Sequence, residues 1–228
     1  MFPAVSIVGK SGSGKTELIE RLIIEFKKRG YRVATVKHSQ RQIDIDKPGK
    51  DSWKFAEAGS EAVVAISPDR LLFTRSLEHE PKLEEILRLI GSDVDLVLIE
   101  GFRKGKAPKI EVHRKELGGE LLCPVTMLSA IVTDESLDID VPQFPPDDTR
   151  AIADFIEKDL VSQGKGDTTL FVNGKQIFIK QFIKDVISRT LIAMVSTLKG
   201  VGEIKSVDIF IRKRPDKWKS KGKSKNAK

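Results

Sequence analysis

Apolar residues follow two different spacings along the first two thirds of the chain. Short continuous apolar runs bounded by glycine or charged residues are typical of strands buried in a sheet. Longer segments with apolar residues three and four positions apart are typical of amphipathic helices. The expected strands are 3–8, 32–37, 62–67, 70–74, 94–99, 110–113 and 127–132, and the expected helices are 15–29, 51–58, 81–90 and 148–160. This alternation predicts an α/β fold with a mainly parallel sheet flanked by helices.

The pattern changes after residue 160. Residues 161–167 read VSQGKGD and are expected to form a linker. Beyond it, two apolar runs flank Asn173-Gly174, a pair that suits a tight hairpin turn, and a helical pattern and a last apolar run follow. We therefore predict a main domain, a linker, a small α+β domain of ββαβ order and a disordered basic tail. Their bounds are 1–160, 161–167, 168–214 and 215–228, with the small domain's elements at 170–172, 176–179, 181–198 and 206–211.

The positive charge is concentrated at the C-terminal end. The formal net charge is +7, and residues 212–228 alone carry nine Lys or Arg and one Asp, or +8, so the rest of the chain sums to −1. The high isoelectric point is therefore no argument for nucleic-acid binding by the main domain. No apolar run approaches the ~18 residues that cross a bilayer, so we expect no membrane partner. The single cysteine, Cys123, permits no internal disulfide, and we expect a cytoplasmic protein.

Residues 9–16 read GKSGSGKT and match the P-loop, a phosphate-binding motif that stands between a strand and a helix. Its fixed positions are Gly9, Gly14, Lys15 and Thr16, and the positions between them are Lys10, Ser11, Gly12 and Ser13. The glycines let successive N–H groups face phosphate oxygens, and the helix that follows adds its positive end. Lys15 is expected to reach the β- and γ-phosphates, and Thr16 to offer its hydroxyl to Mg²⁺. The sequence thus predicts a P-loop NTPase fold.

A magnesium site also needs a carboxylate. Glu100 follows the strand 94–99 and stands at the carboxyl edge, where open α/β sheets bind their ligands. Asp95 lies at the other end of that strand, about 16 Å away at ~3.3 Å per residue, so we assign Glu100 and leave Asp95 as a solvated strand start. The Asn-Lys-x-Asp motif that reads guanine in many GTPases is absent. Asp134, after the strand 127–132, could accept hydrogen bonds from guanine N1 and N2, or be an ordinary loop residue.

Three segments together resemble one family. Residues 36–59 read VKHSQRQIDIDKPGKDSWKFAEAG, with GKSGSGKT before them and LVLIEGFR after them. In this order they closely resemble the adapter proteins of molybdopterin-guanine dinucleotide biosynthesis, the MobB family, and AIVTD at 130–134 looks like that family's late strand and its Asp. The resemblance covers about residues 5–160. It implies a GTP-binding, homodimeric P-loop protein with Mg²⁺ that helps a separate nucleotidyltransferase attach GMP to molybdopterin. Any GTP hydrolysis would be weak, with Lys15 and Glu100 as its catalytic candidates.

The segment 36–59 adds further candidates for contact with the nucleotide or with a pterin phosphate. Lys37 and His38 stand at the carboxyl edge of their strand, and Asp46 and Asp51 lie in the mixed acidic and basic loop that follows. A solvated surface loop and a structural histidine are the alternatives. Lys10, at the second P-loop position, could contact the nucleotide of a partner subunit, as such lysines do in some dimeric P-loop proteins.

Two other functions are compatible with a P-loop. A small-molecule kinase or synthetase would need a catalytic base, for which only His38 or Asp46 is available. A metallochaperone GTPase would need a Cys/His cluster, and one cysteine with three scattered histidines argues against it. The basic tail could contact the nucleotidyltransferase, an acidic apoenzyme or RNA, or could simply keep the protein soluble.

Overall fold

The computed structural model describes residues 3–39, 47–91, 93–161, 168, 170–172, 175–204, 207–209 and 211, with backbone alone at 175 and 176. The chain divides into two compact units, Met1–Phe178 and Ile179–Lys228, and each is described here by itself. The predicted linker beyond Val161, the turn Asn173-Gly174, Asp46 and the basic tail lie outside the described residues.

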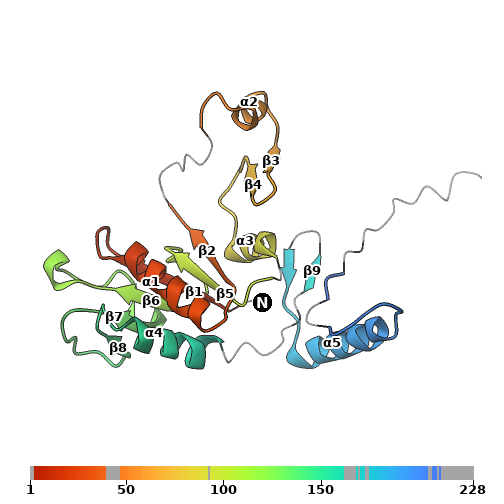
Figure 1. Cartoon of the computed structure of the whole chain (residues 1–228). Coiled ribbons are helices and arrows are strands. Elements are labelled where there is room, and N and C mark those ends of the chain that lie inside the picture. The colour runs from red at the N-terminus through yellow and green to blue at the C-terminus, as the bar shows by residue number, and fades with distance from the viewer. Residues whose placement is uncertain are drawn as a thin grey trace, which may run out of the picture. The chain divides into compact units, whose positions relative to one another are not determined.

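The centre of the first unit is a six-stranded, all-parallel sheet in the order β2-β5-β1-β6-β7-β8 (Figure 1). The strands are β1 (Ala4–Gly9), β2 (Val33–Lys37), β5 (Leu96–Glu100), β6 (Lys109–Val112), β7 (Leu128–Val132) and β8 (Gln143–Phe144). The sheet confirms the predicted α/β class. Only β8 was not predicted, because two residues give no apolar run. Since all strands are parallel, β1, β5, β6 and β7 end at one edge, which brings the segments that follow them together.

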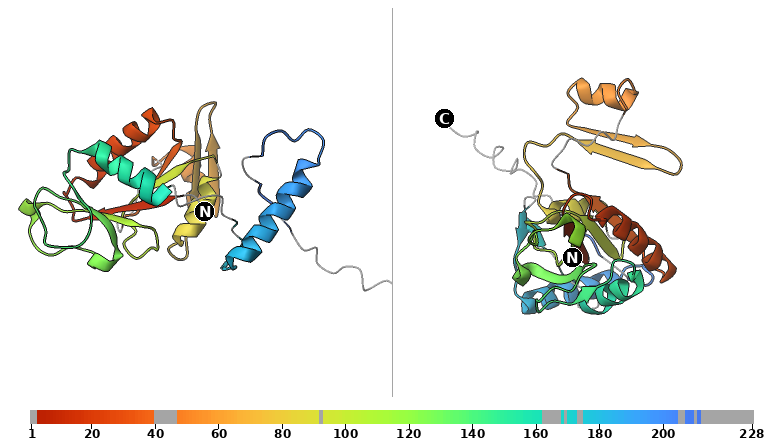
Figure 2. Two further views of the ribbon diagram at one scale, coloured as in Figure 1. Left: turned by 90° about the horizontal axis from the view of Figure 1, so that it is seen from below. Right: turned by 90° about the vertical axis from the view of Figure 1, so that its left-hand side faces the viewer.

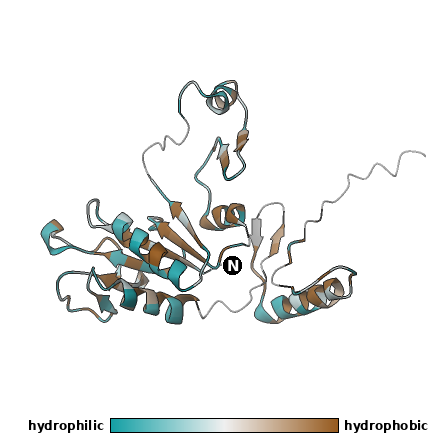
Figure 3. Cartoon of the chain, viewed as in Figure 1, coloured by the Kyte–Doolittle hydropathy of each residue, from teal (hydrophilic) through white to brown (hydrophobic). Residues whose placement is uncertain are grey.

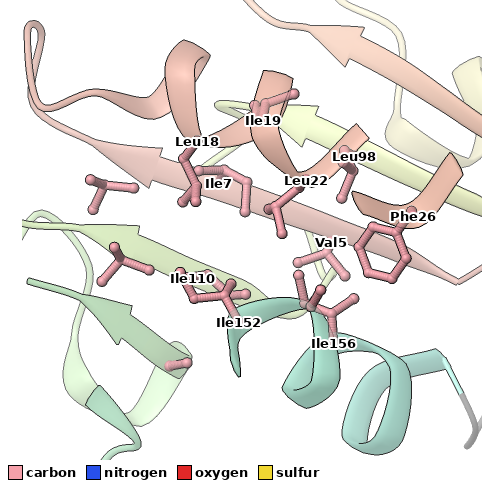
Figure 4. Close-up of a cluster of buried hydrophobic side chains, with 14 of the residues drawn as sticks. Val5, Ile7, Leu18, Ile19, Leu22, Phe26, Leu98, Ile110, Ile152 and Ile156 are labelled. Carbon is pink, nitrogen blue, oxygen red and sulfur yellow. The ribbon is translucent and has the colours of Figure 1, made fainter. Parts of the chain in front are cut away.

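Helices α1 (Lys15–Lys28) and α4 (Thr149–Phe155) cover one face of the sheet. Figure 4 shows the cluster they enclose, in which Leu22 and Phe26 of α1 meet Val5 of β1 and Ile152 of α4, all with no exposed surface. Each such side chain contributes about 1.5–3 kcal/mol when it leaves water. Asp148 caps α4 by accepting a hydrogen bond from the N–H of Ala151, and a π-helical turn, η3 (Ile156–Val161), continues it. The predicted helix 148–160 is therefore observed in two forms.

The other face carries a smaller cluster. Helix α3 (Leu83–Ile90) places Leu83 and Leu87 against Val97 and Ile99 of β5. Leu96 and Leu98 of the same strand belong to the cluster under α1. Strand β5 is therefore buried on both sides, which explains why its sequence is a continuous apolar run rather than an alternating one.

Between β2 and β5 the chain makes an excursion that does not join the parallel sheet. It contains α2 (Asp51–Glu57) and the strands β3 (Ala62–Ile66) and β4 (Leu71–Arg75), which pair antiparallel as a separate two-stranded sheet. Figure 2 shows α2 beside this ribbon, and Figure 3 shows that both of its strands are strongly apolar. The two strands were predicted from the sequence, but their separation from the main sheet was not.

The remaining elements follow residue 168. Strands β9 (Leu170–Val172) and β10 (Lys175–Ile177) form the predicted antiparallel hairpin and belong to the first unit. The second unit contains α5 (Gln181–Ser196), none of whose described side chains is fully buried. Residues 207–209 and 211, within the last predicted strand 206–211, are not in a strand. Within the described ranges, no helix has the length and apolar character needed to cross a membrane.

Candidate nucleotide-binding site

The P-loop turns from the end of β1 into α1, and its glycines make that turn possible. Gly9 has a φ of 147°, and a Cβ placed there would collide with the carbonyl oxygen of Val112 in β6. Gly14 directly precedes α1 and has a left-handed φ of 90°. Other residues rarely adopt these conformations, so glycine is required at both positions. The loop thus wraps the N-terminus of α1, where N–H groups without helical partners can bind an anion.

Lys15 lies across this loop. Its Nζ donates a hydrogen bond to the carbonyl oxygen of Lys10 at 2.6 Å. Burial lowers the pKa of Lys15, nearby Glu100 opposes that shift, and the positive charge of Lys37 adds to it. The ammonium group therefore stands at the centre of the loop, where it can exchange a carbonyl partner for phosphate oxygens.

Thr16 and Glu100 meet as the sequence predicts. The Thr16 hydroxyl donates to Oε2 of Glu100 at 3.0 Å, and Nζ of Lys37 lies 3.5 Å from the same oxygen. Asp95, by contrast, binds Arg32 at 3.0 Å at the other end of β5. Within the described residues, no group of three His, Cys, Asp or Glu side chains could hold a metal ion. The hydroxyl and the carboxylate nevertheless suit Mg²⁺, which takes its other ligands from phosphate and water.

The other candidates from segment 36–59 lie elsewhere. Nε2 of His38 is 2.7 Å from Oε1 of Glu80, and its ring packs against Phe102 with the ring centroids 4.7 Å apart. Asp51 opens α2, is 85% exposed and pairs with Lys54. The structure therefore brings Lys37 to the P-loop, pairs His38 with Glu80 just before α3, and leaves Asp51 in solvent.

Asp134 follows β7 at the same edge of the sheet. Its Oδ1 accepts a hydrogen bond from the backbone N–H of Lys115 at 2.9 Å, and its Oδ2 lies 3.8 Å from a guanidinium nitrogen of Arg114. The backbone hydrogen bond from Lys115 lowers the pKa of Asp134 most, burial opposes it, and the backbone N–H of Asp134 itself and the charge of Arg114 lower it further. The carboxylate is thus held ionised, as an acceptor for donors on a base would require.

Two contacts of the P-loop were not predicted. Nε of Arg114 donates to the carbonyl oxygen of Ser13 at 3.1 Å. Nζ of Lys10 donates to the carbonyl oxygens of Leu117 and Gly118, at the end of the short 3-10 helix η1 (Lys115–Leu117). The sequence held one signal for Arg114, because it directly follows the strand predicted at 110–113 and so stands at the ligand edge.

The first strand of this parallel sheet leads through GKSGSGKT into a helix, and Thr16 donates a hydrogen bond to Glu100 at the end of the neighbouring strand β5. This arrangement defines the P-loop NTPase class of fold. The family model described as "Molybdopterin guanine dinucleotide synthesis protein B" (MobB) matches residues 4–134. This chain belongs to the MobB family, which confirms the resemblance seen in the sequence.

Relatives and solved structures agree with this assignment. The "Molybdopterin-guanine dinucleotide biosynthesis adapter protein" of Haemophilus influenzae is 38% identical, over 68% of this chain and 88% of that protein. A solved structure titled "Crystal Structure of molybdopterin-guanine biosynthesis protein B (mobB)" is 34% identical with a TM-score of 0.54, over 69% of this chain and 99% of that one. A relative from Methanocaldococcus jannaschii is 26% identical over 91% of this chain and 96% of that protein, so its alignment extends into the region after residue 160.

Proposed function

We propose that this protein is a cytoplasmic GTP-binding adapter that helps a nucleotidyltransferase form molybdopterin guanine dinucleotide. The observation that carries the proposal is the convergence of Lys15, Thr16, Lys37 and Glu100 at the carboxyl edge of the sheet, next to the P-loop. Membership of a family whose relatives bear the adapter name supports the pathway.

The same residues would hold the triphosphate with Mg²⁺. Gly9, Ser11, Gly12, Ser13 and Gly14 would present backbone N–H groups to the phosphates, and Lys15 would bind their oxygens. The Thr16 hydroxyl would bind Mg²⁺, with Glu100 binding the ion or its water. Hydrolysis would be slow, because the carboxylate of Glu100 already accepts a hydrogen bond from Thr16 and pairs with Lys37, and His38 is paired with Glu80. Neither is a free base for activating water.

The base would be selected by Asp134. A carboxylate can accept from both N1–H and the N2 amino group of guanine, and adenine lacks this pair of donors. The N–H of Lys115 bonds to Oδ1 of Asp134, whereas the guanidinium group of Arg114 lies 3.8 Å from Oδ2, so Oδ2 would be available to a donor on the base. Titration calorimetry with GTP and ATP in the presence of Mg²⁺ tests this assignment. Equal affinities for the two nucleotides would overturn it.

Two copies would assemble through the β3–β4 hairpin. Ile66 pairs with Leu71 and Val64 with Phe73 across the hairpin, and all four are exposed, Ile66 by 76% and Leu71 by 65%. Such a contiguous apolar strip favours a partner surface, and a two-fold axis would let the strip of one copy cover that of the other. Lys10, which here contacts its own chain, is the candidate for contact with the other copy's nucleotide.

Reconstitution tests the adapter role directly. Purified transferase, molybdopterin, GTP and Mg²⁺ would be combined with the wild-type protein or with Lys15→Ala. We expect the wild type to raise the rate of dinucleotide formation, and the variant to raise it much less because it cannot hold GTP. Equal rates with and without the wild-type protein would rule out the adapter role. Direct binding of molybdopterin would appear as a change in its fluorescence when the protein is added without transferase.

A further inference from the structure

Arg114 joins two parts of the candidate site that lie far apart in the sequence. Nε of its guanidinium group donates to the Ser13 carbonyl oxygen in the P-loop at 3.1 Å, and another nitrogen lies 3.8 Å from the carboxylate of Asp134. A Cβ added to Gly14 would lie 3.3 Å from this guanidinium group, so the group also packs against the next P-loop residue. The side chain is only 22% exposed, which strengthens its polar contacts relative to those made in open water.

The contact with Ser13 fixes the direction of a phosphate-binding group. The carbonyl of Ser13 and the N–H of Gly14 belong to one planar trans peptide and point in opposite directions. Because Arg114 holds the carbonyl on its own side, the Gly14 N–H is directed to the other side. In a P-loop, that N–H is one of the donors that a phosphate oxygen uses.

The residues around Arg114 hold Asp134 in place relative to the loop. The next residue, Lys115, donates its N–H to Asp134, and Lys10 of the P-loop donates to the end of η1. His113, just before Arg114, is buried and lies 2.8 Å from Glu135, just after Asp134. Two consecutive basic residues after β6 thus face two consecutive acidic residues after β7. The two strand ends are joined by paired contacts, and the P-loop is attached to the same segment.

We propose that Arg114 is a positioning residue that couples phosphate binding to base selection, by orienting the Gly14 N–H for phosphate and the Asp134 carboxylate for guanine. This inference rests on the proposed function, in which Asp134 reads the base. A planar guanidinium group can contact two acceptors in fixed directions, whereas a lysine ammonium is a single point charge. Arginine is therefore required for the coupling, and lysine would restore charge without restoring both orientations.

The test compares three ligands on four proteins. The ligands are GTP, ATP and inorganic tripolyphosphate, each with Mg²⁺, and the proteins are wild type, Arg114→Ala, Arg114→Lys and Arg32→Ala. Arg32 is the matched control, because it also forms an Arg–Asp pair, with Asp95, but at the opposite end of its strand. Calorimetry gives the dissociation constants, and circular dichroism checks that each variant is folded.

We expect Arg114→Ala to weaken the binding of tripolyphosphate and of ATP by about tenfold each, which is the effect of one charge-assisted hydrogen bond. The binding of GTP should weaken by about tenfold more. The preference for GTP over ATP would therefore fall about tenfold. Arg114→Lys would recover part of the tripolyphosphate affinity but not the preference, and Arg32→Ala would change neither. The Arg114→Lys variant keeps the test decisive if Arg114→Ala does not fold.

The outcomes separate the inference from the proposed function. If the wild type prefers GTP and the Arg114 variants keep the full preference, Arg114 does not couple the two parts, and the inference is wrong while the proposed function stands. If the wild type binds GTP and ATP equally, the proposed selection of guanine by Asp134 is wrong, whatever the Arg114 variants do. An equal loss of affinity for all three ligands would show that Arg114 only supports the structure of the site, and the inference would be wrong.

Discussion

The six-stranded sheet and the β3–β4 hairpin are built from similar sequences but have opposite environments. Leu96–Ile99 of β5 are all without exposed surface, whereas Ile66 and Leu71 of the hairpin are mostly exposed. The strands β3 (AVVAI), β4 (LLFTR) and β5 (LVLIE) are each five residues long and mainly apolar. The difference shows that an apolar sequence indicates a strand that must be buried. Which element or which other chain buries it depends on the rest of the fold.

The sheet obtains its cover from within the chain. β5 has a strand on each side, α1 on one face and α3 on the other. Among the strands that the structure describes, β3 and β4 pair with each other alone, and the short helix α2 contacts β3. Since isolated two-stranded sheets are marginal in water, the hairpin needs a further surface, which the proposed dimer would supply. Nucleotide binding and assembly would then belong to different regions.

The strongest test of this division is Lys15→Ala, at the edge of the sheet. Replacing Lys15 removes at least two charge-assisted contacts to phosphate, so we expect GTP affinity to fall ~1,000-fold or below detection. Calorimetry measures the affinity, and sedimentation equilibrium measures assembly. The monomer–dimer equilibrium should be unchanged in the absence of nucleotide. A variant that no longer assembles without nucleotide would mean that the two regions are not separate.

The converse test is Ile66→Asp in the hairpin. A two-fold dimer would lose an apolar contact of about 1.5–3 kcal/mol in each copy, so the dimer dissociation constant should rise by more than ~100-fold. Sedimentation equilibrium of this variant would be compared with that of Ile24→Asp, which places the same charge at an exposed isoleucine of α1. GTP affinity should change far less than it does with Lys15→Ala. If Ile66→Asp assembles like Ile24→Asp, the hairpin is not the dimer surface.

The smallest expected effect concerns the stability of the sheet domain in acid. Tyr31 and then Arg29 donate to Glu157 in η3 at 2.7 Å each, and these hydrogen bonds lower the pKa of the carboxyl. A lowered pKa stabilises the fold above the unfolded value near 4.5, and this contribution is lost as the pH falls through the folded value. Glu157→Gln should therefore reduce the free energy of unfolding by about 1 kcal/mol at pH 7, allowing for partial exposure.

Urea unfolding at pH 7 and pH 3 measures this effect. The difference between wild type and Glu157→Gln should shrink at the lower pH, because pH 3 lies below the unfolded pKa and the stabilisation is lost as the pH falls toward the folded one. Glu20→Gln, at an exposed position of α1, is the control and should show little difference at either pH. A difference for Glu157→Gln that is the same at both pH values would show that the ionised carboxyl does not stabilise the domain.

The sequence predicted most of the sheet because apolar periodicity and glycine positions are local signals. It also predicted that Glu100 and not Asp95 would lie at the P-loop, because in a parallel sheet the end of a strand fixes the edge at which a residue lies. The role of each site residue stays a prediction. Arg114 was missed because its contacts join loops after different strands, and no spacing along the chain encodes such a meeting.

The sequence also could not predict which strands pair with one another. The sequence marked 62–67 and 70–74 as strands, but nothing local says whether a strand joins a parallel sheet or pairs with its neighbour. Here the short connection between β3 and β4 favours the antiparallel hairpin. The structure likewise does not put residues 207–209 or 211 in a strand, because an apolar run becomes a strand only where another strand pairs with it.

The excursion between β2 and β5 has a consequence for how the chain can vary. These two strands lie side by side although residues 38–95 separate them, so folding must close that whole loop. The entropy of loop closure grows only with the logarithm of length, and halving or doubling the loop changes it by about 0.6 kcal/mol. Insertions and deletions in the part of this segment that precedes α3 should therefore cost the sheet little, whereas α3 itself must stay because Leu83 and Leu87 cover β5. The length of this segment can drift during evolution while the phosphate-binding edge stays intact.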